Sequence, residues 1–311
     1  MIEKKMLNIP LDDLSYSKDL KALFRRLSAG ASGYWYFIKS RTLVYTFASA
    51  TCIAALISVQ GAASLPLLLI ATLGMYLASL GVYVYNDITD IGEDSINSAQ
   101  RPLIAGKVTK SQAAKFIVAI WSASLLLQVS LTWAAAGMTL LYILLGVVYS
   151  HPATHLKKLF PLKTVVTALG GAMASLVGGL AAGGITPQVL FAATVFFLFF
   201  FILGPLGDVG DLEGDRMQGR RTFPVVLGIK NTIRLVLSLP VVISLLALIS
   251  YHYFNFNLVS PILVGIISTV SFLILRPLTS HWENKKYLKK TRNRIRPMHI
   301  LLQAAILFSA I

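Results

Sequence analysis

Residues 64–94 decide the fold, and they read SLPLLLIATLGMYLASLGVYVYNDITDIGED. Residues 64–85 are almost entirely apolar, and about 20 such residues are needed for a helix to cross the hydrocarbon core of a bilayer. The run then ends in acidic residues, which are costly inside lipid and by default point to a function. This stretch therefore predicts a membrane-spanning helix whose final turns carry carboxylates at the membrane surface.

Similar apolar runs recur along the whole chain. Hydrophobic residues make up 56% of the 311 residues and charged residues only 13%, whereas a soluble domain carries about 25% charged residues. Only helices and closed barrels satisfy the backbone in lipid, and these runs lack the alternation of a barrel strand. We predict an all-α, polytopic membrane helical bundle of about nine transmembrane helices; the other spans are 43–59, 113–133, 134–149, 164–182, 188–206, 233–254, 258–275 and 298–311.

The domain organisation follows from the same pattern. Residues 1–42 are polar and charged, with no apolar core typical of a signal peptide, and are expected to lie in the cytoplasm or at the membrane interface. Residues 43–311 form one transmembrane domain, which carries the predicted activity.

Charged residues are confined to one side of this predicted bundle. The loops near 60–63, 134–137, 183–187 and 255–257 contain no Lys, Arg, Asp or Glu. Cytoplasmic loops carry the Lys/Arg excess, so we expect an integral, multi-pass protein of the cell membrane with its N-terminus and charged face in the cytoplasm. The net charge of +15 is better explained by anionic lipid and an anionic substrate than by nucleic acid, which is not expected as a partner.

Two acidic clusters follow the second and sixth spans. Each has three aspartates separated by three and then four residues, a spacing that places side chains on one helical face. The aspartates are Asp87, Asp90 and Asp94 in the first cluster, and Asp208, Asp211 and Asp215 in the second. Like charges stacked in this way require a cation, and ligands that are all hard oxygens favour Mg²⁺ over zinc. Because Mg²⁺ commonly bridges carboxylates to substrate phosphates, the pair of clusters predicts a diphosphate clamp.

Basic residues accompany both clusters. Arg101 and Lys107 follow the first, and Arg221 belongs to a basic group that follows the second. The loop after the fourth span contains Tyr149, Lys157 and Lys158, which either hold diphosphate oxygens or, in the case of the lysines, anchor the loop on anionic lipid. A further basic run over 285–296 is interpreted as a lipid anchor, worth about 1 kcal/mol per charge; attraction of an anionic substrate is the alternative.

The two clusters resemble the signatures of the UbiA superfamily of intramembrane prenyltransferases. The first signature, Asn-Asp-x-x-Asp-x-x-x-Asp, matches at Asn86, Asp87, Asp90 and Asp94, and the second, Asp-x-x-Asp-x-x-Gly-Asp, matches from Asp208 to Asp215. The resemblance implies that Asn86 joins the six aspartates as a metal ligand, and that Asp87, Asp90, Asp208 and Asp211 are catalytic. It also implies a diphosphate-binding role for Arg41, which many relatives follow with Pro where this chain has Thr42.

The resemblance further implies a Mg²⁺-dependent transfer of a prenyl group from a polyprenyl diphosphate to a hydrophobic or aromatic acceptor within the membrane. Geranylgeranylglyceryl phosphate and a quinone precursor are examples of such acceptors. Two alternatives stay open: a terpene cyclase of the same fold, which needs no acceptor, and an ion-coupled transporter, whose carboxylates tend to sit singly near the midplane. The aromatic residues expected to steady an allylic cation are Tyr83, Tyr85, Tyr142, Phe196, Phe197, Phe199, Phe200 and Phe201.

Overall fold

The computed structural model describes residues 34–39, 41, 43–92, 101–254 and 256–310, and all regular secondary structure in these ranges is helical. The elements in chain order are α2 (Val44–Ser58), α3 (Leu65–Thr89), α5 (Lys110–Val129), α6 (Trp133–Ser150), the 3₁₀ turn η1 (Leu156–Lys158), α7 (Leu162–Ala182), α8 (Pro187–Gly210), α9 (Leu212–Met217), α10 (Phe223–Tyr253), α11 (Val259–Leu275), α12 (Leu278–His281) and α13 (Lys285–Ala310).

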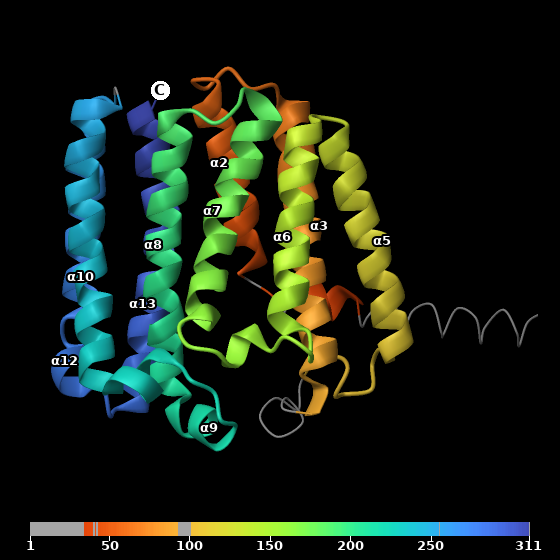
Figure 1. The fold of residues 1–311 in the computed structure, drawn as a ribbon. Helices are drawn as coiled ribbons and strands as arrows, with labels where there is room; N and C mark the ends of the chain where they lie inside the picture. Colours follow the sequence, from red (N-terminus) through yellow and green to blue (C-terminus); the bar gives the residue numbers. More distant parts are fainter. Residues whose placement is uncertain (1–33, 40, 42, 93–100, 255, 311) are drawn as a thin grey trace, which may run out of the picture.

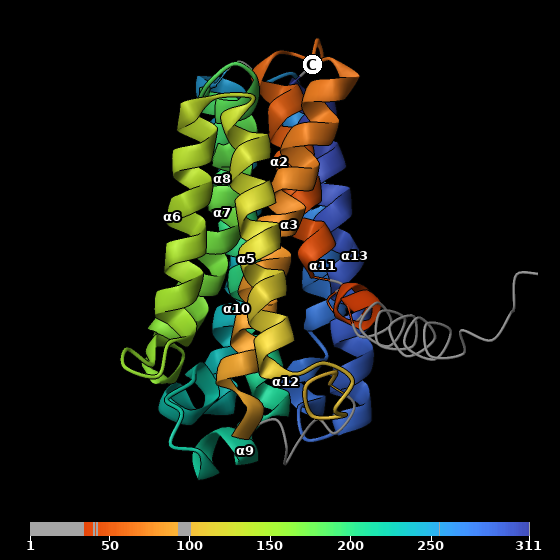
Figure 2. The same cartoon turned by 90° about the vertical axis from the view of Figure 1, so that its right-hand side faces the viewer.

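The long helices run side by side with two very different ends (Figures 1 and 2). At one end lie the short elements η1, α9 and α12, together with residues 101–109, which precede α5. At the other end lie the tight connections from α2 to α3 and from α7 to α8. The first end contains the described residues of both acidic clusters. The acidic side chains therefore gather at one end of the bundle, as the sequence predicted.

The predicted all-α membrane bundle is confirmed, and each predicted span overlaps a helix of the described residues. Seven segments of the described residues are long and apolar enough to cross a membrane by themselves; α2 is shorter, with 15 residues. Two helices begin before the N-terminal limits of their predicted spans. The helix α10 begins at Phe223 rather than 233 and bends at Gly228, whose φ of 75° favours glycine. The helix α13 begins at Lys285 rather than 298, because its basic residues continue the helix beyond the apolar run.

Small and hydroxyl-bearing residues let the helices approach closely, as is common in membrane bundles. The helix α7 packs between α2 and α8. A Cβ atom added at Gly178 of α7 would lie 2.1 Å from the carbonyl oxygen of Thr51 in α2. The Thr51 hydroxyl in turn donates a hydrogen bond of 2.8 Å to the carbonyl of Ala174. The pair α3 and α5 is joined similarly, since Ser124 Oγ donates to the Gly74 carbonyl at 2.7 Å.

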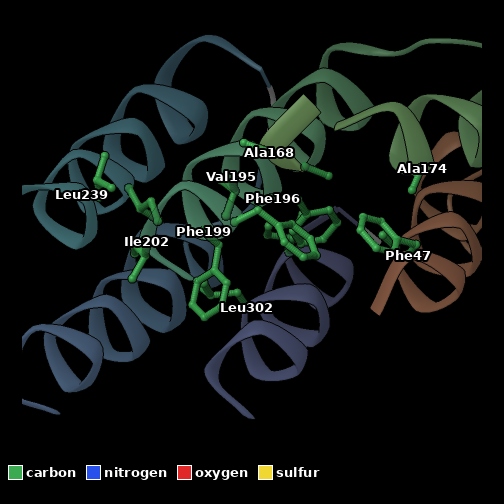
Figure 3. Close-up of a cluster of buried hydrophobic side chains, with 14 of the residues drawn as sticks. Phe47, Ala168, Ala174, Val195, Phe196, Phe199, Ile202, Leu239 and Leu302 are labelled. Carbon is green, nitrogen blue, oxygen red and sulfur yellow. The ribbon is translucent and has the colours of Figure 1, made fainter. Parts of the chain in front are cut away.

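The apolar core lies between α2, α7, α8, α10 and α13 (Figure 3). Phe196 and Phe199 of α8 are fully buried there, near Leu302 of α13 and Phe47 of α2. Phe47 also stacks on Phe200, with ring centroids 5.0 Å apart. This packing holds α8 against α2 and α7, and so determines where the second acidic cluster lies relative to the first.

Candidate active site

The first acidic cluster lies at the C-terminal end of α3. Asp87 belongs to the last turn, and the backbone N–H of Asp90 closes the helix by donating to the carbonyl of Asn86. The two aspartates are 2% and 7% exposed. Asn86 Nδ2 donates to Asp90 Oδ2 at 3.0 Å, and Asn86 Oδ1 accepts from Ser150 Oγ at 2.9 Å, which ties this end of α3 to α6.

Cations from three other segments neutralise this cluster. Arg41, just before α2, forms an ion pair with Asp87, and Arg101 Nη1 donates to the same oxygen, Asp87 Oδ1, at 2.8 Å. Lys157, itself buried, forms an ion pair with Asp90. A helix C-terminus is the negative end of the helix dipole, so carboxylates there need such partners. Burial, together with the nearby charge of Arg101, lowers the pKa of Arg41 to about 10, which leaves it protonated at neutral pH.

The second cluster spans the junction of α8 and α9. Asp208 is in the last turn of α8, and Asp215 is in α9; both side chains are buried. Lys163, at the start of α7, lies between them, with Nζ 2.6 Å from Asp208 Oδ1 and 3.7 Å from Asp215 Oδ2. Arg220 adds a further contact, 3.6 Å from Asp215 Oδ1. The cluster is therefore held by one lysine that joins both carboxylates.

Residues around the two clusters are linked by electrostatic interactions and by a backbone hydrogen bond. Arg101, which pairs with Asp87, lies within electrostatic reach of both Asp90 and Arg220. The loop that carries Lys157 is also joined to the segment after α9, because the backbone N–H of Arg221 donates to the carbonyl of Lys158 at 3.0 Å. Cations and carboxylates of both halves thus belong to one polar region at the charged end of the bundle.

A cavity of about 220 Å³ lies next to this polar region, between α2, α3, α6 and α7. Its polar end includes Arg41, Asn86 and Ser150, and its wall is largely aromatic and aliphatic. The aromatic residues of that wall are Phe47, Tyr83, Tyr142 and Tyr149. The Arg41 guanidinium lies 5.6 Å from the centroid of the Tyr83 ring. An amphiphile with an anionic head and an apolar chain fits the chemistry of these walls.

Most of the predicted site residues converge, but some do not. Lys107 is exposed, and its Nζ lies 4.7 Å over the ring of Tyr36, away from the carboxylates. Arg221 is exposed and joins the site through its backbone. Asp211 is exposed as well, because α8 ends at Gly210 and the three-and-four spacing no longer follows one continuous helix. Asp94 lies outside the described residues. The metal-binding, catalytic and diphosphate-binding roles of all the predicted site residues stay predictions.

The predicted aromatic residues also fall into two groups, of which only one lines the cavity. Tyr83 and Tyr142 line the cavity, whereas Phe196, Phe199 and Phe200 are buried around the ring of His299, at centroid distances of 5.2 to 5.4 Å. Sequence reasoning did not identify Phe47 or Lys163 as site residues. The available signal for Lys163 was its position at the start of an apolar span, at the same membrane face as both acidic clusters.

The residues present fit a divalent metal ion. Asp87, Asp208 and Asp215 each keep one buried oxygen, Oδ2, without a hydrogen-bond partner. Buried and unsatisfied carboxylate oxygens are costly, and a hard cation is the ligand that such oxygens prefer. Among the described residues, no three His, Cys, Asp or Glu side chains form a ready-made cage. A Mg²⁺ site typically takes one or two protein carboxylates and completes its coordination with water and phosphate oxygens.

Together these features define a multi-pass membrane protein with an acidic, cation-balanced site at the mouth of an apolar cavity. The model of the UbiA prenyltransferase family matches residues 47–296. The chain belongs to this family.

Relatives and solved structures agree with that assignment. The chain is 33% identical over 169 residues to the digeranylgeranylglyceryl phosphate synthase of Sulfolobus acidocaldarius, a match that covers 54% of this chain and 60% of that protein. It is 29% identical over 216 residues to the enzyme of the same name from Sulfurisphaera tokodaii, covering 69% and 76%. Among solved structures, a digeranylgeranylglyceryl phosphate synthase superposes with a TM-score of 0.73 at 23% identity, covering 91% of this chain and 99% of the other. A UbiA homologue from Archaeoglobus fulgidus, bound to DMAPP and Mg²⁺, superposes with a TM-score of 0.70 at 17% identity, covering 88% and 98%.

Lys163 is expected to support the second cluster energetically. Replacing it in Lys163→Met removes the ammonium group between Asp208 and Asp215, so two buried carboxylates lose their shared partner. The free energy of unfolding, measured by dodecyl sulfate titration in magnesium-free neutral detergent, should fall by about 3 kcal/mol. Added Mg²⁺ should recover part of this loss.

The control for that measurement is Lys285→Met, since Lys285 pairs with Glu213 at 3.7 Å on the open surface. Such exposed pairs contribute about 0–1 kcal/mol. Equal losses in the two variants would show that Lys163 is an ordinary surface lysine.

Proposed function

We propose that this protein is a Mg²⁺-dependent prenyltransferase that moves a polyprenyl group from its diphosphate to a lipid acceptor bearing a glycerol phosphate. The observation that carries the proposal is the pair of buried carboxylate clusters, each with unsatisfied oxygens, beside a cavity with an apolar and aromatic wall. The names of the relatives from Sulfolobus acidocaldarius and Sulfurisphaera tokodaii support a glycerol phosphate lipid as the acceptor, ahead of an aromatic one.

In the proposed complex, the diphosphate lies between the two clusters. Arg41, Arg101 and Lys157 face it from the first side, and Lys163 and Arg220 from the second. Mg²⁺ held by Asp87, Asp90, Asp208 and Asp215 would lower the negative charge of the leaving diphosphate. When diphosphate enters, the cations that now pair with carboxylates gain phosphate oxygens as partners, so their positive charge is directed at the group whose charge develops in the reaction.

In the same proposed complex, the prenyl chain lies in the cavity between α2, α3, α6 and α7. The bond from its first carbon to the diphosphate oxygen breaks, and the electron pair leaves with diphosphate. The rings of Tyr83, Tyr142 and Phe47 present their negative faces to the allylic cation and exclude water. The acceptor hydroxyl oxygen then forms an ether bond to that carbon and loses its proton.

The carboxylates should be essential for turnover but not for insertion. Asp87→Asn and Asp208→Asn are each expected to lower kcat by about 100-fold or more, and EDTA should abolish activity reversibly. Glu213→Gln is the matched control, because Glu213 is an exposed carboxylate near the second cluster. The measurement is product formation from geranylgeranyl diphosphate and geranylgeranylglyceryl phosphate in neutral detergent. Full activity in EDTA would refute the metal-dependent mechanism.

The same assay separates the alternatives. Product formed from geranylgeranyl diphosphate without any acceptor would identify a terpene cyclase. Product formed with 4-hydroxybenzoate but not with the glycerol phosphate lipid would identify an aromatic acceptor. Either outcome overturns the lipid acceptor proposed here.

The proposed orientation places the active end in the cytoplasm, supported by the concentration of Lys and Arg at that end. Met217→Cys and Ala62→Cys, made in a Cys52→Ser background, test it at exposed positions of opposite ends. A membrane-impermeant maleimide applied to intact cells should label Ala62→Cys directly and Met217→Cys only after permeabilisation. The reverse pattern would invert the topology.

A further inference from the structure

A second polar cleft lies beside the second acidic cluster, between the end of α8 and the first turns of α13. Its volume is about 270 Å³. Gly210 and Asp211 line it from α8, and four cations line it from α13, namely Lys285, Lys289, Arg292 and Arg296. These four positions are spaced by four, three and four residues, so they form one face of the helix.

The basic run of α13 therefore divides into two faces. Lys286, Lys290 and Arg294 do not line the cleft and are exposed. Leu288 and Ile295 between the faces are buried and fix the rotation of the helix. Attraction to anionic lipid headgroups alone does not require cations to be arranged on a particular face of the helix, because any exposed cation contributes to it.

Arg292 has the most specific setting of the four cations. It is half-buried, and its guanidinium lies against two glycines of α8: Nη2 is 3.7 Å from the place of a Cβ atom at Gly207, and Nη1 is 3.4 Å from that place at Gly210. These are ordinary contact distances, so a planar group with five N–H donors packs against the end of α8, which carries Asp208.

The cleft has an excess of positive charge. Among the described residues, no carboxylate forms an ion pair with Lys289, Arg292 or Arg296, while Arg292 and Arg296 are close enough to repel one another. Lys285 has an acidic partner, Glu213, at 3.7 Å on the open surface. Asp211 also lines the cleft, so four cations there face one carboxylate of the described lining. Such an excess of cations favours an anion with several acceptor oxygens.

A second cavity continues from this cleft. It measures about 310 Å³ and shares Gly210, Lys285 and Leu288 with the basic cleft. Leu212, Ile229 and Trp282 form an apolar part of its wall, and Glu213 and Glu283 line the remainder. The two spaces together match an amphiphile whose anionic head meets the cations and whose apolar part continues along Trp282.

We propose that the basic cleft binds the phosphate monoester of the lipid acceptor and brings it to the second carboxylate cluster. This inference rests on the proposed function and assigns a site to its second substrate. Arg41, Arg101 and Lys157, which we propose bind the donor diphosphate, pair with Asp87 and Asp90 and do not line this cleft. A dianionic monoester suits the three cations of the cleft that have no ion-pair partner among the described residues.

The test compares two triple variants of the full-length protein in neutral detergent, without donor. The cleft variant is Lys289→Gln/Arg292→Gln/Arg296→Gln. The matched control, Lys286→Gln/Lys290→Gln/Arg294→Gln, removes the same three charges from the other face of the same helix. The probe is geranylgeranylglyceryl phosphate, compared with the phosphate-free alcohol geranylgeranylglycerol.

We expect the cleft variant to bind the phosphate probe at least tenfold more weakly than wild type, while the control variant binds it as wild type does. The alcohol should bind all three proteins equally. In turnover, the cleft variant should raise the KM of the acceptor at least tenfold and leave that of the donor unchanged. If the triple variant unfolds, the single variant Arg292→Gln should show the same direction, with a thermal midpoint near that of wild type.

Three outcomes overturn the inference: equal weakening in both triple variants, a rise in the donor KM instead of the acceptor KM, or displacement of the probe by an equal concentration of phosphatidylglycerol. The last result would mean that the cleft holds bulk anionic lipid. Failure of the proposed function gives a different result. If the wild-type protein binds the probe through the basic cleft but forms no product, the prenyltransferase activity is refuted and phosphate binding in the cleft is supported.

Discussion

The structure depends on carboxylates that are buried at the ends of membrane helices. Asp87 and Asp208 are 2% and 4% exposed and sit where the helix dipole is negative. Neither site is tolerable without positive charge, and that charge comes from segments far apart in the sequence: Arg41 before α2, Arg101 after α3, and Lys163 at the start of α7. The acidic clusters therefore organise the whole charged end of the bundle, and the apolar packing behind them keeps the two clusters facing one another.

The same constraint links stability to function. Each cation that pairs with a carboxylate can also donate hydrogen bonds to a phosphate. Asp87, Asp208 and Asp215 each retain a buried oxygen without a hydrogen-bond partner. The site thus has acceptors for a metal ion and donors for an anion at one place. The cavity adjoining it supplies the third requirement of the chemistry, an apolar and aromatic space that holds a chain and excludes water.

Much of this arrangement could be predicted from the sequence, and there are physical reasons why the other features could not. Apolar run length determines helices in lipid, so the bundle and the ends that carry Asp87 and Asp208 were predictable. The start of α13 was not, because its first turns are basic and hydropathy detects only the apolar part. In the sequence, Lys163 cannot be distinguished from a lysine that anchors a loop at the membrane. Its pairing with Asp208 becomes evident only once α7 is packed against α8. Asp211 shares the spacing of its neighbours, but the helix break at Gly210 leaves it exposed on the side of the basic cleft.

The central claim is that both clusters hold one diphosphate together with divalent metal. Electron paramagnetic resonance of Mn²⁺, used in place of Mg²⁺, tests it directly in the presence of a non-hydrolysable thiolo analogue of geranylgeranyl diphosphate. The account predicts that the analogue tightens Mn²⁺ binding, that bound Mn²⁺ shows coupling to phosphorus, and that Asp87→Asn and Asp208→Asn each reduce the amount of Mn²⁺ bound. Mn²⁺ binding that is indifferent to the analogue, or that survives in the variant lacking both carboxylates, would contradict it.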